Sequence, residues 1–213
     1  MRSRFDEQLA QLNREMIEMG AQCEEVIALA SKALTEADMK LAAKVAPLSA
    51  DIDRKEREIE ALCLRLLLQQ QPVARDLRQI SAALKMITDL ERIGDQAEEI
   101  ADIIGFIDGH NPEDYITLTE MAKAAIHMVT ESIDAYVKHD TILAEKVVDE
   151  DDIVDEYFLQ VKSKLIAKIA ENPDDGEYAL DLLMIAKYFE RIGDHATNIA
   201  EWVEYSMTGA HLP

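Results

Sequence analysis

Apolar residues recur along most of the chain at steps of three and four positions, which is the spacing of one face of an α-helix. Asp38 and Asp140 stand where helix N-caps are expected, and Pro47 must kink or split the second helix. Six long helices are predicted, separated by short turns. They cover residues 4–34, 38–71, 75–107, 112–138 and 140–171, and a last stretch from the Asn172–Gly176 turn to Gly209.

The chain contains an internal repeat. The sequence ERIGD occupies Glu91–Asp95 and recurs unchanged at Glu190–Asp194, an offset of 99 residues. Further upstream the offset is 102 residues and pairs Asp53 with Asp155. Such self-similarity indicates two copies of one structural module. The fold class is therefore predicted to be all-α, with two tandem three-helix bundles of antiparallel helices at residues 1–109 and 110–213.

Composition supports this interpretation and limits the partners. The chain has 213 residues, 48% of them hydrophobic, with seven glycines, five prolines and a formal net charge of −21. It has no run of about 18 apolar residues and no signal peptide, so a cytoplasmic protein is expected. The buried-looking Cys23 and Cys63 are expected to be reduced core thiols. The negative charge argues against nucleic acid and favours cations or basic protein surfaces.

Carboxylates form a stripe on the third predicted helix. At about 100° per residue, Glu91, Asp95, Glu98, Glu99 and Asp102 lie close together on the wheel. The apolar residues of this helix lie on the other side, so the acids are expected to face away from their own core. The sixth helix repeats the stripe with Glu190, Asp194, Asn198 and Glu201.

A second row of carboxylates lies on the preceding helix of each repeat. In an antiparallel hairpin, facing residues have numbers that average to the centre of the turn. Asp53 and Asp95 average to the turn after Pro72, and Asp155 and Asp194 average to the Asn172–Gly176 turn. The two rows should therefore meet in both repeats. Each row carries one further acid without a counterpart, Glu56 in the first and Asp151 in the second.

Two interpretations of these acids remain open. Carboxylates one turn apart, facing a similar pair, can bridge hard or borderline cations. The alternative is a solvated acidic face, which is the usual role of a charge run. A ferritin-type di-metal oxidase needs Glu-x-x-His pairs, which the chain lacks, and no catalytic triad or phosphate loop is present, so no enzyme is expected. Gly94 and Gly193 suggest close approach of another helix.

The chain resembles the PhoU family, which are accessory regulators of the high-affinity phosphate importer. The resemblance rests on Gln71-Pro72 followed by Asp76-Leu77-Arg78, on Asp89–Asp95, and on Glu190–Asp194 followed by Asn198-Ile199. It implies tandem three-helix bundles, a homodimer, and multinuclear iron or zinc clusters on Glu/Asp-x-x-x-Asp motifs. Ser49 departs from such a motif. The matching residues are Asp53, Glu91, Asp95, Glu99, Asp102, Asp151, Asp155, Glu190, Asp194, Asn198 and Glu201.

The resemblance also implies a function. Such a protein would be a negative regulator of phosphate uptake and of phosphate-starvation genes. Its partners would be the ATPase subunit of the phosphate ABC importer and a sensor histidine kinase, and it would reach the membrane only through them. The alternatives are a metal-binding or metal-storage bundle without a signalling partner, and a helical scaffold with an acidic surface.

Overall fold

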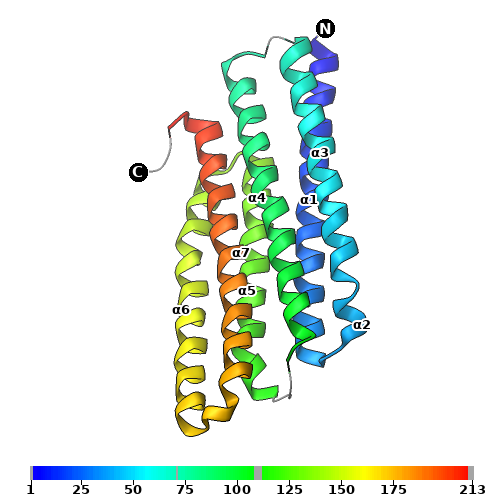
Figure 1. Cartoon of the computed structure of the whole chain (residues 1–213). Coiled ribbons are helices and arrows are strands. Elements are labelled where there is room, and N and C mark those ends of the chain that lie inside the picture. The colour runs from blue at the N-terminus through cyan, green and yellow to red at the C-terminus, as the bar shows by residue number, and fades with distance from the viewer. Residues whose placement is uncertain (1, 71, 108–111, 211–213) are drawn as a thin grey trace.

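Helices account for all the regular structure in the described part of the chain. The computed structural model describes residues 2–70, 72–107 and 112–210, and every regular element in these ranges is helical (Figure 1), which confirms the predicted fold class. The elements are α1 (Arg2–Glu36), α2 (Met39–Ala42), α3 (Val45–Gln70), α4 (Ala74–Ile104), α5 (Pro112–Lys138), α6 (Thr141–Glu171), the 3-10 turn η1 (Pro173–Asp175) and α7 (Gly176–Thr208).

The expected capping residues define the helix ends. Asp38 caps α2 by accepting a hydrogen bond from the Lys40 amide at 2.7 Å, and Asp140 caps α6 by accepting one from Leu143 at 3.1 Å. These side chains satisfy amide groups that have no partner within the helix. At the other end of the chain, Gly209 follows α7 with φ of 77°, a left-handed conformation that glycine adopts without strain.

The second predicted helix is split, as Pro47 requires. A short α2 is separated from α3 at Ala43 and Lys44, and Pro47 lies in the first turn of α3, where its missing amide hydrogen costs no helical hydrogen bond. The helix α4 ends at Ile104, somewhat before the predicted end near residue 107. The predicted break at Gly109 and Asn111 lies outside the described residues.

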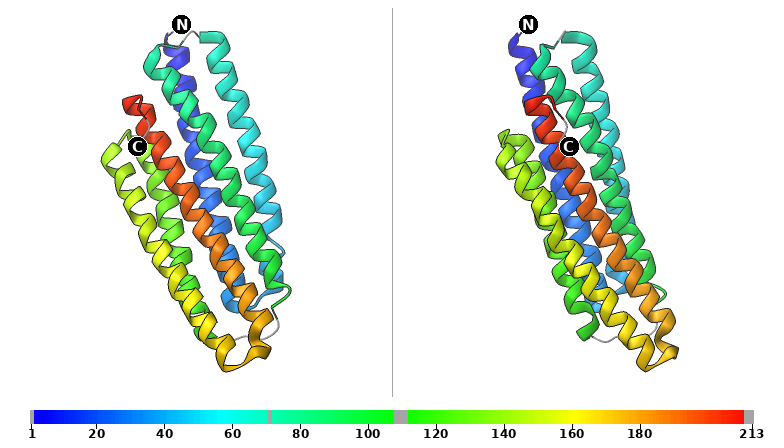
Figure 2. Two further views of the ribbon diagram at one scale, coloured as in Figure 1. Left: turned by 60° about the vertical axis from the view of Figure 1, so that its left-hand side comes forward. Right: turned by 90° about the vertical axis from the view of Figure 1, so that its left-hand side faces the viewer.

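Within each half of the chain, three long helices follow one another in alternating directions (Figure 1). The helices α4 and α7 lie side by side and antiparallel in the middle of the molecule, with α3 and α6 on opposite outer sides (Figures 1 and 2). The contact between α4 and α7 joins the third helix of one repeat to the third helix of the other. No helix in the described ranges has the length and apolar character needed to cross a bilayer.

Buried side chains from both halves form one continuous hydrophobic cluster. Ile93 and Ile192, the central residues of the two ERIGD sequences, are fully buried in it. Cys23 and Cys63 are buried free thiols, as expected, and the Cys23 thiol donates to the Leu90 carbonyl at 3.3 Å. The division into units at residues 1–109 and 110–213 stays a prediction, because the two halves share this cluster.

We expect Ile93→Asp or Ile192→Asp to lower the free energy of unfolding by about 3 kcal/mol or more, because either places an unpaired charge in the core. Urea unfolding followed by circular dichroism measures this loss. The control is Ile166→Asp on α6, whose side chain is 59% exposed and should change stability little. Equal stability of all three variants would contradict the assigned core.

Candidate functional site

Three carboxylates converge between α3 and α4. Asp53 comes from α3, and Glu91 and Asp95 come from successive turns of α4. One carboxylate oxygen from each lies within 4.8 Å of the others, and all three side chains are half-buried. The antiparallel hairpin therefore brings Asp53 opposite Asp95, as the numbering predicts. We call Asp53, Glu91 and Asp95 the first carboxylate cluster.

The first cluster holds its negative charge at some cost. Burial raises the pKa of Glu91, and the neighbouring charges of Asp95, Asp53 and Glu56 raise it further. The guanidinium of Arg92 opposes this shift, since its Nη1 lies 3.1 Å from Asp95 and its Nε 3.4 Å from Glu91. Arg92 is thus an ion-pair partner of both carboxylates. Among the described residues, the buried Asp53 Oδ1 has no hydrogen-bond partner.

A second carboxylate cluster lies between α6 and α7, centred on Asp151. Burial raises the pKa of Asp151 to about 6, and the charges of Asp194, Asp155 and Glu190 add to the shift. Its Oδ1 atom is buried and has no hydrogen-bond partner in the described part of the chain. Glu190 forms an ion pair with Lys187 one turn away. We define the second cluster as Asp151, Asp155, Glu190 and Asp194.

Glycine allows the helices to approach closely at both clusters, as predicted. A Cβ atom on Gly193 would lie 3.1 Å from Asp151 Oδ1, and one on Gly94 would lie 3.2 Å from Ile52 Cδ1 and 3.5 Å from Ser49 Oγ. Ser49 and Asp151 occupy equivalent positions in the two repeats. The same glycine therefore faces a hydroxyl in the first repeat and a carboxylate in the second, so the clusters differ in charge.

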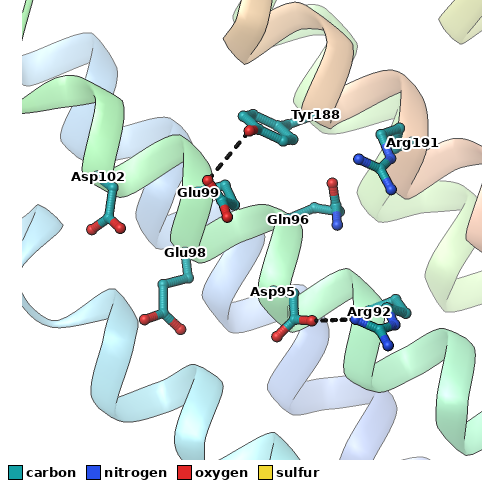
Figure 3. A pocket seen from close by; sticks show the side chains of 8 residues that line it. All are labelled: Arg92, Asp95, Gln96, Glu98, Glu99, Asp102, Tyr188 and Arg191. Carbon is teal, nitrogen blue, oxygen red and sulfur yellow. Dashed lines mark hydrogen bonds and ion pairs between the residues drawn. The ribbon is translucent and has the colours of Figure 1, made fainter.

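Two of the predicted site residues lie away from the first cluster. Glu99 and Asp102, together with Glu98, line a groove of about 410 Å³ between α4 and α7 (Figure 3). The opposite wall carries Tyr188 and Arg191, and the Tyr188 hydroxyl donates to Glu99 at 3.2 Å. We call this space the inter-repeat groove. Glu99 thus faces the other repeat, whereas Glu98 and Asp102 point away from α7 (Figure 3).

Asn198 also takes part in a contact between the repeats. Its amide nitrogen donates to Asp89 Oδ1 at 3.1 Å, and His195 Nδ1 lies 2.9 Å from the same oxygen. Glu201 is half-buried on α7. Sequence reasoning missed Asp89 and Tyr188, because it compared each acid stripe only with its own repeat. A usable signal existed, since these two residues are equivalent at the 99-residue offset.

A third group, between α5 and α6, was not predicted. His127, Glu131 and Glu150 place one potential ligand atom each within 4.8 Å of one another. The ammonium of Lys146 lies 2.9 Å from Glu131 and 3.1 Å from Glu150. A lysine of the same chain already compensates these carboxylates, so this group is best described as an ion-pair network.

The donor atoms of both clusters are of a type that binds metal ions, and those of the first cluster also lie within 4.8 Å of one another. All are carboxylate oxygens, which bind hard and borderline divalent cations. Asp53 and Asp151 each hold a buried oxygen without a partner among the described residues, and leaving such an oxygen unpaired is costly. A cation would satisfy these oxygens and relieve the repulsion that raises the pKa of Glu91 and Asp151.

The raised pKa of Asp151 leads to a pH-dependent stability. A folded-state pKa above the unfolded value adds stability at low pH, and this stability is lost as the pH rises through about 6. In metal-free protein, Asp151→Asn should therefore raise the free energy of unfolding at pH 8 by on the order of 1 kcal/mol. The gain should shrink between about pH 6 and pH 4. Thermal melts with a chelator present measure it.

The matched control for this pH effect is Asp149→Asn, which removes an exposed carboxylate of the same helix. It should change stability little at either pH, since an exposed carboxylate stays solvated. A gain for Asp151→Asn that is the same at pH 4 and pH 8 would show that the carboxylate is not protonated in the folded state within this range.

Comparison with protein families gives one result for both halves of the chain. The family model described as the PhoU domain matches residues 16–104 and again residues 118–203. Each match contains one ERIGD sequence and the carboxylate residues of one cluster.

Curated relatives match over nearly the full length. Proteins named phosphate-specific transport system accessory protein PhoU homolog, from Clostridium acetobutylicum and Pseudomonas aeruginosa, are each 34% identical over 98% of this chain, which covers 96% and 87% of their lengths. The crystal structure of PhoU from Pseudomonas aeruginosa superposes with a TM-score of 0.91 at 34% identity, covering 97% of this chain and 100% of that one. The phosphate transport system regulatory protein PhoU from Streptococcus pneumoniae gives a TM-score of 0.89 at 25% identity, covering 98% and 99%.

Proposed function

Because the chain belongs to the PhoU family, we propose that it is an accessory regulator of phosphate-specific transport. The observation that carries this proposal is the match of both repeats to the family, with full-length relatives named for this role. In this proposal the protein acts in the cytoplasm as a homodimer. It restrains phosphate uptake and starvation-gene expression by contacting the importer's ATPase subunit and a sensor histidine kinase.

Charge supports a mechanism based on protein contacts. The chain carries a formal net charge of −21, and its charged groups lie mostly on the helix surfaces. Such a protein attracts basic faces of other proteins, and this attraction weakens as ionic strength rises. The proposed role assigns no chemical step to the protein. It would therefore act by binding other proteins and ions.

We further propose that the two carboxylate clusters bind transition-metal ions, with iron and zinc as the candidates. Asp53, Glu91 and Asp95 would hold metal in the first repeat, and the Asp151-centred cluster would do so in the second. The unpartnered buried oxygens of Asp53 and Asp151 support this assignment. A bound cation would supply positive charge that holds the paired helices together. Glu99, Asp102, Asn198 and Glu201 stay predicted ligands that line the neighbouring surfaces.

The metal proposal predicts that natively purified protein contains iron or zinc by elemental analysis. A quadruple variant should contain at least about tenfold less metal per protein, because each cluster loses two ligands. Its substitutions are Glu91→Ala, Asp95→Ala, Glu190→Ala and Asp194→Ala. Its helicity should be kept, since alanine favours helices.

The matched control for metal content replaces four exposed carboxylates by alanine, at Glu58, Glu145, Glu171 and Glu177. It removes the same formal charge and should keep the metal. Equal metal content in the wild type and the cluster variant would eliminate the cluster assignment. Equal loss in the two quadruple variants would mean that the metal is held only by diffuse negative charge.

The regulatory proposal predicts that deleting the gene raises phosphate uptake and switches on starvation genes even when phosphate is plentiful. Affinity capture from cells should retain the importer's ATPase and the sensor kinase. Normal repression in the deletion strain, with no capture of either protein at high or low phosphate, would refute regulation. In that case, bound metal in the natively purified protein would favour the alternative, a metal-storage bundle.

A further inference from the structure

The inter-repeat groove contains a buried polar group that lacks a partner. Gln96 projects from α4 into the groove and is only 5% exposed (Figure 3). Its Oε1 atom has no hydrogen-bond partner within the described ranges. A buried acceptor without a partner is destabilising, so native proteins rarely keep one without a ligand or water. The Gln96 oxygen is therefore an acceptor that a water molecule or a ligand can satisfy.

The equivalent surface on the other side of the α4–α7 contact is already satisfied. At the 99-residue offset, Gln96 corresponds to His195 and Glu99 to Asn198, while Tyr188 corresponds to Asp89. His195 and Asn198 both contact Asp89, which closes that side.

On the groove side, the three equivalent residues leave the Gln96 side-chain oxygen without a hydrogen-bond donor among the described residues. Tyr188 donates its single hydroxyl hydrogen to Glu99, so it does not pair with Gln96. The groove is thus the unclosed member of a pair of equivalent surfaces.

The charge of the groove favours a cation. Its walls carry the four carboxylates of Asp95, Glu98, Glu99 and Asp102 against the guanidinium groups of Arg92 and Arg191, and Arg92 is already paired with Asp95. The excess of negative charge disfavours a phosphate or another anion.

The spacing of the groove acids disfavours a single metal ion. In the described chain, Asp95 is the only groove acid that belongs to a set of ligand atoms within 4.8 Å of one another, and that set is the first carboxylate cluster. A guanidinium suits such a site better, because its five N–H donors extend over a planar fork and can reach several acceptors at once.

We propose that the inter-repeat groove binds an arginine side chain of a partner protein. The guanidinium donates to Gln96 Oε1 at depth and to the Glu99 carboxylate nearer the solvent. This assignment rests on the proposed function, since it names the side chain by which a regulatory partner docks. It places that partner across both repeats, on α4 and α7 together.

The groove is tested by NMR titration of the full chain with N-acetyl-arginine amide, following the Gln96 side-chain amide signal. That signal is assigned by its loss in Gln96→Met. The wild type should show a saturable shift. Glu99→Gln should weaken binding about tenfold or more, because it removes a charged acceptor while leaving one for Tyr188. The control Glu145→Gln, at an exposed position outside the groove, should bind as the wild type does.

Other probes separate this site from its alternatives. N-acetyl-lysine amide should bind more weakly, and equal affinity would overturn the guanidinium assignment. Saturation of the Gln96 signal by MnCl₂ or MgCl₂ but not by the arginine probe would show a metal site instead. Equal weakening by Glu145→Gln would show only a diffuse attraction by the acidic surface.

Gln96→Met separates binding from folding. Losing an unpartnered buried acceptor should leave the melting temperature unchanged or raised, while weakening capture of the partner from cells about tenfold. Unchanged capture by both Gln96→Met and Glu99→Gln would refute the groove as the docking site and leave the proposed function standing. If the wild type captures neither importer nor kinase, the proposed function fails, and the titration still reports whether the groove accepts arginine.

Discussion

Packing of apolar helix faces holds like-charged carboxylates together against their repulsion, and both clusters depend on it. The ERIGD sequence shows how one turn achieves this. Ile93 is fully buried in the shared core, Gly94 lets α4 approach α3, and Glu91 and Asp95 are thereby held opposite Asp53. Burying one isoleucine contributes about 2 kcal/mol, whereas one like-charge pair on a helix costs a few tenths. The fold can therefore keep charged clusters that a less well-packed hairpin would separate.

The repeats share a scaffold but differ at the position that faces the motif glycine. In the first repeat this position is Ser49, which is almost fully buried; in the second it is Asp151, whose pKa is raised to about 6. A hydroxyl at this depth is neutral, so the first cluster carries no charge at the position that faces its motif glycine. The second cluster carries an acid whose protonation changes near neutral pH. The two halves thus share a backbone arrangement but differ in whether a hydroxyl or a carboxylate faces the motif glycine.

Much of this structure follows from local sequence signals, because caps, breakers and apolar spacing act over a few residues. Asp38, Asp140 and Gly209 mark helix ends as predicted, and the hairpin numbering placed Asp53 opposite Asp95. The antiparallel contact between α4 and α7 is different, because it depends on how two repeats dock. Each helix wheel assigned its acids to one stripe, and only the docking decides that Glu99 faces Tyr188 rather than α3.

The first cluster and the inter-repeat groove share Asp95, and this couples their electrostatics. Arg92 pairs with both Glu91 and Asp95, so one guanidinium offsets charge on both surfaces. A cation held by the cluster would compete with Arg92 for these carboxylates and would also lower the negative potential at the groove, because Asp95 belongs to both. On the proposed assignments, ion occupancy in the cluster would therefore oppose the attraction of a basic side chain to the groove. The link needs no change of fold, because it acts through charges that α4 carries on adjacent turns.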